Sequence, residues 1–297
     1  MHNEEAYLDM LRRILDEGAY RKPEDEEGRY ELFAQPLRFD LSGNKLPLMT
    51  TKKVFFKSLA VEMLWFLSGA QDIEMLKQNK VGIWNIWANE QGVVGPLYGF
   101  QWRHWRIDPA VRKHYGGAEE IDQMAQVMKT LAERPEARSH MVTAWRPDHL
   151  KLMSIKPCHI LLQFYRVDNK VSLMLTQRSC DAYLGVPFNI AQYSLLTHMV
   201  AHQLGCEAGE FIWVGGDVHV YENHVEQVRA QLEKPIHGVP TLHIKRKPED
   251  LFSYRYDDFE VRDYVHAEYV PAEVSPQGQP GKGVLLGEYD CDCKPRA

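Results

Sequence analysis

The stretch from Pro157 to Asn189, PCHILLQFYRVDNKVSLMLTQRSCDAYLGVPFN, indicates the fold of this chain. Residues 158–167 and 171–179 read as two strands, because a turn at Asp168-Asn169 separates two runs of strand-forming residues. A long apolar helix is expected to follow, from about residue 189 to residue 205. Strands packed around so apolar a helix predict an α+β protein.

The same stretch carries the residue types of a nucleophilic site. Cys158 is followed along the chain by Arg178, Ser179, Asp181 and Asn189. A cysteine reacts as its thiolate, and a nearby arginine with a second hydrogen-bond donor favours that form. A lone cysteine is more often a small buried hydrophobic residue. The assignment of Cys158 as a nucleophile therefore depends on the rest of the sequence.

Hydrophobic periodicity predicts further elements on both sides of this stretch. Apolar residues at helical spacing, or runs of strand-forming residues, are the signals used. The expected helices are 6–18, with Gly18 as its cap, 58–69 and 120–133. The other expected segments are extended residues 30–41, a strand at 139–145 and a charged loop at 21–28.

Length and composition agree with a water-soluble enzyme. The chain has 297 residues and a formal net charge of -6, which disfavours nucleic acid or an anionic membrane as the main partner. No apolar run approaches the roughly 20 residues that span a bilayer, and the acidic start lacks a signal peptide's features. The five cysteines are irregularly spaced, as in a protein with free thiols. We therefore expect a cytoplasmic protein.

Several further blocks of sequence occur in one order between about Tyr7 and about Tyr264. With these blocks the chain resembles the thymidylate synthase family. The blocks are PLMTTKK at 47–53, EMLWFL at 62–67, IWNIWA at 83–88, GPLYG at 95–99, GGDVHVY at 215–221 and IKRKP at 244–248.

The resemblance implies an architecture for the whole chain. A catalytic domain is expected over residues 1–264, and a C-terminal segment with a flexible extension over 265–297. The family's fold has three layers: a twisted, mixed, six-stranded sheet packs back to back with that of a second subunit in a homodimer, and helices cover its other face. Pro, Gly and Gln are frequent after Val274, which is typical of flexible chain. The pair Cys291 and Cys293 is weak evidence for a metal, and we expect none.

The resemblance also implies a reaction. Family members methylate deoxyuridylate (dUMP) at C5 with 5,10-methylenetetrahydrofolate, and they release thymidylate and dihydrofolate. Cys158 would bond to C6 of the uracil, and Glu62 would relay protons through water. Tyr98 would assist the water that removes the C5 proton, and His159 and Asn189 complete the catalytic set. A carboxylate such as Glu62 among apolar neighbours is costly to keep without a function.

Nucleotide recognition is divided between base, sugar and phosphate. The amide of Asn189 can both donate and accept, so it suits the N3 hydrogen and O4 of uracil. His219 and Tyr221 lie two apart on an extended segment and would face the sugar 3′-hydroxyl together. The remaining nucleotide-binding residues implied by the resemblance are Gln177, Arg178 and Ser179, with Arg138 contributed to the phosphate site by the partner subunit.

The folate co-substrate is assigned to another group of residues. Trp84 and Trp87 would shield the pterin, Asp181 would bond a pterin nitrogen, and Lys52 would contact the glutamate tail. Without the resemblance, the two tryptophans would be interpreted as core residues and Lys52 as a solvated side chain.

The phosphate site departs from the family pattern at two positions. Glu24 stands where family members carry an arginine that closes over the phosphate, and Ser139 replaces the second arginine of the partner's pair. Each charge-assisted contact is worth roughly 1.5 to 3 kcal/mol, so weaker phosphate binding is expected unless Arg29 or Lys53 compensates.

These departures leave two alternatives open. If the altered loop and tail admit water, the chain would be a 5-hydroxymethylase of dUMP or another pyrimidine nucleotide, with tetrahydrofolate released. Alternatively, it would bind a nucleotide or RNA without catalysis. The presence of Cys158, Glu62, Tyr98 and Asn189 favours an enzyme, since a binding module needs no nucleophile.

Overall fold

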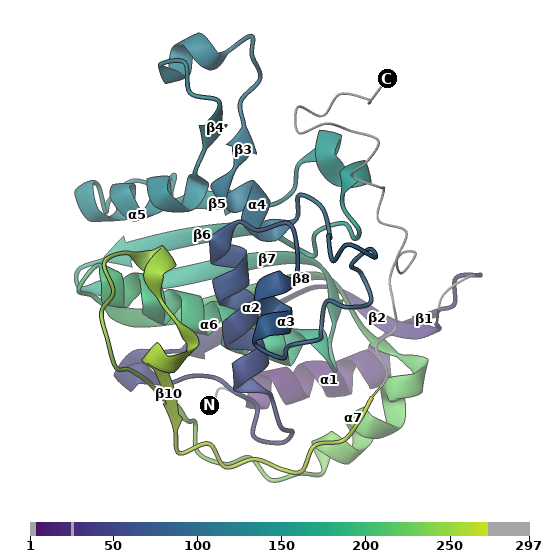
Figure 1. Ribbon diagram of the computed structural model, residues 1–297. Coiled ribbons are helices and arrows are strands. Elements are labelled where there is room, and N and C mark those ends of the chain that lie inside the picture. The colour runs from purple at the N-terminus through teal and green to yellow at the C-terminus, as the bar shows by residue number, and fades with distance from the viewer. Residues whose placement is uncertain (1–3, 25–26, 273–297) are drawn as a thin grey trace.

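A computed structural model describes residues 4–24 and 27–272 of the chain (Figure 1). The stretch after Val274 that was predicted to be flexible, with the cysteine pair at 291 and 293, lies outside these residues. In the described part, no helix is both long and apolar enough to cross a membrane.

A six-stranded mixed sheet forms the centre of the fold, as the resemblance implied. Its order is β1-β2-β8-β7-β6-β5. Strands β7 and β8 are parallel, and the other neighbouring pairs are antiparallel. The strands are β1 (Ala19–Arg21), β2 (Arg29–Asp40), β5 (Met141–Thr143), β6 (His159–Val167), β7 (Lys170–Asp181) and β8 (Glu207–Tyr221).

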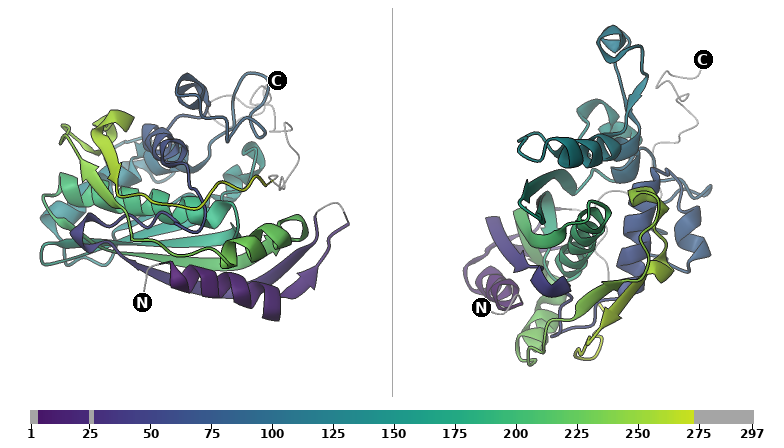
Figure 2. Two further views of the ribbon diagram at one scale, coloured as in Figure 1. Left: turned by 90° about the horizontal axis from the view of Figure 1, so that it is seen from below. Right: turned by 90° about the vertical axis from the view of Figure 1, so that its left-hand side faces the viewer.

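Helix α6 (Gly185–Gln203) connects the two parallel strands and is the central helix of the fold. Parallel neighbours require such a crossover connection. The helix is apolar on almost every side and correspondingly buried, packing on β7 and β8. Helix α2 (Phe56–Ser68) packs in turn on α6, and Figure 2 shows these helices stacked over one face of the sheet.

Helix α6 begins four residues before the predicted start at Asn189. The side chain of Asp181 accepts hydrogen bonds from the backbone N–H groups of Tyr183 and Leu184, both at 3.0 Å. Pro187 was compatible with this earlier start, since proline is tolerated in the first turn of a helix. These side-chain bonds of Asp181 form a turn that ends at Leu184, directly before α6, and the prediction began the helix too late because it did not include this turn.

The predicted helix at 120–133 is also shorter than expected. Residues Glu120–Ile121 form strand β4, and the helix α5 covers only Gln123–Glu133. Asp122 causes this boundary, because its side chain caps α5 by accepting from the N–H of Ala125 at 2.9 Å. The hairpin of β3 (Trp105–Arg106) and β4 projects from the body of the molecule in Figures 1 and 2.

The remaining elements surround this framework. Helix α1 ends as predicted, with the N–H of Gly18 donating to the carbonyl of Ile14 at 3.1 Å. The other helices are α1 (Glu5–Glu17), α3 (Glu74–Gln78), α4 (Tyr98–Arg103) and α7 (Val225–Leu232), and the other strands are β9 (Thr241–Ile244) and β10 (Phe259–Arg262). Short 3-10 turns occur at Ser42–Asn44, Arg112–Tyr115, Pro147–Leu152, Glu222–His224, Leu251–Ser253 and Tyr256–Asp258.

The two faces of the sheet differ in burial. Along β7, side chains facing α6 are buried, whereas alternate residues such as Met174 are only half-buried. On β8 the same holds for Ile212 and Val214, and Met174 pairs directly with Ile212 in the sheet. The second face therefore carries partly exposed apolar side chains.

Candidate active site

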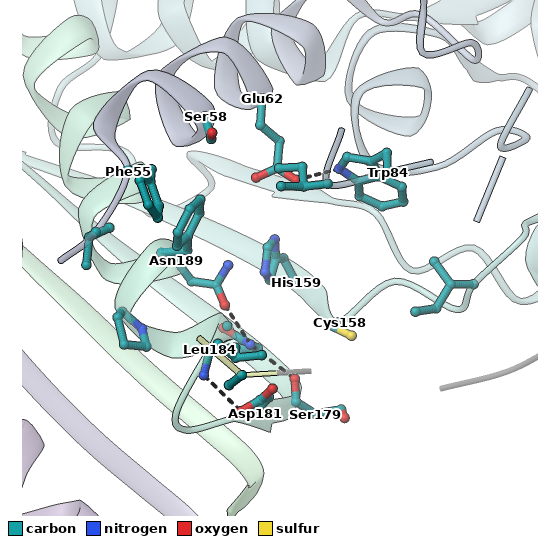
Figure 3. Close-up of a pocket in the computed structure, with 18 of the residues that line it drawn as sticks. Phe55, Ser58, Glu62, Trp84, Cys158, His159, Ser179, Asp181, Leu184 and Asn189 are labelled. Carbon is teal, nitrogen blue, oxygen red and sulfur yellow. Dashed lines mark hydrogen bonds between the residues drawn. The ribbon is translucent and has the colours of Figure 1, made fainter. Parts of the chain in front are cut away.

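A pocket of about 380 Å³ lies between α2, the start of α6 and the ends of β6, β7 and β8. This is a size typical of small-molecule sites. Figure 3 shows Cys158, His159, Asn189 and Glu62 around it. The residues predicted from the sequence that line this pocket are Lys52, Glu62, Trp84, Trp87, Tyr98, Cys158, His159, Gln177, Ser179, Asp181, Asn189 and Tyr221.

Cys158 is held in place from two sides. Its backbone N–H donates to the hydroxyl of Tyr98 at 3.0 Å, and its carbonyl accepts from the backbone N–H of Arg178 at 2.8 Å. The Arg178 guanidinium donates to the carbonyls of Lys156 (2.7 Å) and Pro157 (2.8 Å), and its Nη2 lies 4.0 Å from Sγ of Cys158. Arg178 therefore lies near the thiol, as the sequence predicted.

The ionisation of Cys158 differs from the expectation. Burial raises the pKa of the Cys158 thiol above its ordinary value, although Arg178 and Tyr98 act in the opposite direction. The expectation that arginine would favour the thiolate omitted desolvation, which depends on tertiary packing. The free protein thus holds mainly a thiol at neutral pH.

Glu62, on α2, is buried at 8% exposure and has a hydrogen-bond donor on each carboxylate oxygen. The indole Nε1 of Trp84 donates to Oε1 at 2.5 Å, and Nε2 of Gln192 donates to Oε2 at 2.7 Å. Burial raises the pKa of Glu62 to about 7, and the two donors only partly oppose it. A carboxyl group with this pKa exchanges protons readily at neutral pH.

The orientation of the Asn189 amide is fixed by a chain of donors. The Trp213 indole, which can only donate, gives its hydrogen to Oε1 of Gln177 at 2.9 Å. Gln177 must then present Nε2 to Oδ1 of Asn189, which it meets at 3.0 Å. The amide nitrogen of Asn189 is therefore left to donate elsewhere, and Oδ1 keeps a second lone pair.

His159 is buried next to Cys158, and its Nδ1 lies 2.9 Å from the hydroxyl of Tyr193. Burial lowers the pKa of His159 to about 4. The imidazole is consequently neutral at physiological pH, so it can form hydrogen bonds in the pocket but does not supply a positive charge.

Lys52 is buried, so the interpretation of it as a solvated lysine is wrong. Its Nζ donates to the carbonyl of Tyr183 at 2.6 Å and lies 3.4 Å from the centre of that residue's ring. Burial lowers the pKa of Lys52 to about 7. Nearby, the rings of Trp84 and Trp87 are 5.3 Å apart, and both line the pocket.

Three predicted residues do not line the pocket. Arg138 is exposed on the loop between α5 and β5, and Arg178 lies beside Cys158. His219 is buried, with Nδ1 2.8 Å from Oδ1 of Asp217. Its ring centre is 4.9 Å from that of Tyr221, the member of the predicted sugar-binding pair that does line the pocket.

The sequence interpretation missed some residues of the site. Gln192 donates to Glu62, which lies 130 positions away in the sequence, and its only signal was a polar side chain on a helix expected to be buried. Tyr269 and Ala272 also line the pocket, from a segment that the interpretation placed outside the catalytic domain. This segment is attached to the domain, since the N–H of Ala267 donates to the carbonyl of Thr50 at 2.7 Å.

Comparison with known proteins agrees with this geometry. A family model described as thymidylate synthase matches residues 5–276. The chain belongs to the thymidylate synthase family. A thymidylate synthase of Francisella philomiragia is 45% identical over 282 residues, covering 91% of this chain and 98% of that protein. One of Vesicomyosocius okutanii is 45% identical over 269 residues, with coverages of 91% and 98%.

Membership of the thymidylate synthase family confirms the resemblance seen in the sequence. The family match continues to residue 276, which includes the segment that brings Tyr269 to the pocket. Among the residues that the structure describes, no group of three or more His, Cys, Asp and Glu side chains is arranged to hold a metal ion.

Proposed function

We propose that this member of the thymidylate synthase family methylates dUMP at C5, with 5,10-methylenetetrahydrofolate as the carbon donor, giving thymidylate and dihydrofolate. The observation that carries the proposal is one pocket that is lined by Cys158, Glu62 and Asn189 together. They supply a nucleophile, a proton carrier and an amide that suits uracil. The names of the two relatives agree with methylation and give no support to the hydroxymethylase alternative.

Cys158 performs the covalent step. Its sulfur forms a bond to C6 of the uracil, and the electrons of the C5–C6 double bond move toward C5 and O4. C5 then becomes nucleophilic enough to accept the carbon that the folate supplies. A water assisted by Tyr98 removes the C5 proton, and the sulfur leaves C6 when the C5–C6 double bond is restored. Because the free thiol is protonated, it gives its proton to water before the attack, and the nearby Arg178 stabilises the thiolate that forms.

Asn189 and Glu62 act on the base and its protons. The Asn189 oxygen, already bonded to Gln177, can accept the N3 hydrogen with its second lone pair, while the amide nitrogen donates to O4. Glu62 can return a proton to O4 and to the folate through water, because its pKa of about 7 matches the working pH. Neutral His159 and Tyr98 complete the polar lining around the reacting atoms.

The folate would occupy the aromatic part of the pocket. It supplies the one-carbon unit and afterwards the hydride that completes the methyl group. Trp84 and Trp87 provide apolar walls that exclude water, and Nε1 of Trp87 is buried without a hydrogen-bond partner in the described structure. Asp181 would bond the pterin, and Lys52 would place a cation near the folate's acidic end. These features fit a ligand that is aromatic, polar at its edges and anionic.

We also assign the phosphate of dUMP to Ser179 and Arg178, with Arg138 reaching over from a second copy of the chain. Arg138 is exposed and away from its own pocket, so it can serve a site only in another subunit. The partly exposed apolar side chains of Met174, Ile212 and Val214 on the second sheet face support back-to-back pairing.

Size-exclusion chromatography with light scattering tests this homodimer. The expected mass is about twice the 34.5 kDa of one chain. A monomer that retained full activity would contradict the shared arginine.

The product of the reaction tests the proposed function directly. The purified protein is incubated with dUMP and 5,10-methylenetetrahydrofolate, the nucleotide product is weighed by mass spectrometry, and dihydrofolate is followed by its absorbance. A 5-methyl product with equimolar dihydrofolate is expected. A 5-hydroxymethyl product with tetrahydrofolate would show that water replaces hydride, and absence of any product would contradict catalysis on dUMP.

A further inference from the structure

Gln192 holds the carboxyl group of Glu62 in a way that the family assignment does not explain. It lies on α6 and is fully buried, with Nε2 donating to Oε2 of Glu62 at 2.7 Å. The other oxygen of Glu62 accepts from the indole of Trp84. The amide oxygen of Gln192 is buried and has no hydrogen-bond partner in the described structure. Leaving such an acceptor unpaired is costly unless another state of the site uses it.

The two partners of Glu62 differ in what they can do. The indole of Trp84 can only donate, so it always requires an acceptor oxygen. The amide of Gln192 has a donor and an acceptor, and rotation by about 180° about its terminal bond exchanges them. If Glu62 takes up a proton on Oε2, its new O–H group points at the N–H group of Gln192. Two hydrogen-bond donors then face each other. After the amide rotates, the O–H group of Glu62 donates a hydrogen bond to Oε1 of Gln192, the oxygen that had no partner.

We propose that Gln192 is a positioning residue that keeps Glu62 in place in both protonation states, donating from Nε2 to the carboxylate and accepting through Oε1 from the carboxylic acid. This inference rests on the proposed role of Glu62 as a proton carrier. Only a proton moves, between Glu62 and the water or substrate oxygen, and the amide follows by rotation. The carboxyl group therefore keeps its place and two hydrogen bonds throughout the proton transfer.

The surroundings of Glu62 agree with this assignment. Among titratable groups, Tyr98 on α4 and Tyr193 on α6 interact with it from neighbouring elements, and Cys158, His159, Lys52 and Asp181 line the same pocket. Burial raises the pKa values of both tyrosines well above their ordinary value, so both stay neutral. Because burial also brings the pKa of Glu62 to about 7, both of its forms are populated at neutral pH.

A side-chain amide titration tests the rotation. The Gln192 amide nitrogen of the full-length, ¹⁵N-labelled protein, identified by loss of its signal in Gln192→Met, is followed by NMR from about pH 5.5 to about pH 8.5. Its shift is expected to change with a midpoint near 7, the pKa of Glu62. The change should be absent in Glu62→Gln, in which no proton is exchanged. An unchanging Gln192 signal in the wild-type protein would overturn the proposal.

The kinetic consequence is measured in Gln192→Met, which keeps the side-chain volume. We expect kcat to fall about tenfold, and the kcat midpoint assigned to Glu62 to rise by about one pH unit. The midpoint rises because the charged carboxylate loses its charge-assisted bond from Gln192, which is stronger than the bond that the neutral acid loses. Gln231→Met is the matched control. Gln231 is also buried, donates from Nε2 to Thr51, and has an unpaired Oε1, but lies outside the pocket.

The Gln231→Met profile should superimpose on that of the wild type. If the Gln192→Met profile also matched the wild type while Glu62→Gln lost most of its kcat, the role of Gln192 would be overturned and that of Glu62 would stand. Full activity in Glu62→Gln would instead contradict the proposed function of Glu62.

Discussion

Replacing Cys158 with alanine is expected to lower turnover by a factor on the order of 10⁴ or more, because the covalent bond to C6 can no longer form. Without that bond, C5 of uracil is too weak a nucleophile to accept the folate carbon. The measurement is release of tritium from dUMP labelled at C5, which requires both C6 attack and loss of the C5 proton. Release should be at background level with methylenetetrahydrofolate present.

Cys206→Ala is the control for this experiment. Cys206 is a half-buried free cysteine in the turn between α6 and β8, outside the pocket. Its replacement should leave tritium release within about twofold of the wild type, as expected of a change far from the site. Release at the wild-type rate by Cys158→Ala would show that another group attacks C6, or that the reaction needs no covalent bond.

Replacing Glu62 with glutamine is expected to reduce kcat by about 10² to 10³-fold, the range for loss of a general acid and base. Glutamine can still accept from Trp84 but carries no exchangeable acidic proton. The loss should appear mainly in kcat, since Glu62 contacts the nucleotide through water. Steady-state kinetics across pH is the measurement, and the limb assigned to Glu62 should disappear from the profile.

The same variant is expected to be more stable than the wild type at high pH. The pKa of Glu62 is raised from 4.5 to about 7, so its contribution favours the folded state below about pH 4.5 and is lost as pH rises through 7. A pKa shift of this size corresponds to about 3 kcal/mol in the free energy of unfolding. The wild type loses this stabilisation as pH rises, and the glutamine variant does not. The free energy of unfolding, measured with urea, should be similar for the two proteins at pH 5. At pH 8 it should be higher for Glu62→Gln than for the wild type.

Glu90→Gln provides the comparison, since Glu90 is an exposed glutamate in the loop after Trp87. Its kcat and unfolding free energy should match the wild type at both pH values, the latter within about 0.5 kcal/mol. If Glu62→Gln were less stable at pH 8, the carboxylate would be better solvated than its burial indicates.

Local sequence patterns predicted most elements but misplaced several ends. Asp122 caps α5, Asp181 forms the turn before α6, and neither side chain was included when the starts of these helices were predicted. Both residues were visible in the sequence, so these helix starts could have been predicted from capping and turn rules. The burial of Lys52 could not be predicted from local sequence, because its partner Tyr183 lies 131 positions away along the chain.

The sequence by itself determined the family, the reaction class and the residue types that line the pocket. Blocks containing Glu62, Trp84, Tyr98, Cys158 and Asn189 were sufficient for this, because the sequence itself specifies which functional group each residue carries. Only the tertiary structure decided how these groups ionise and which partners they have. The raised pKa values of Cys158 and Glu62, and the bond from Gln192, arise from desolvation and from contacts between distant segments. Such effects depend on what surrounds a side chain in space, which its neighbours in sequence do not specify.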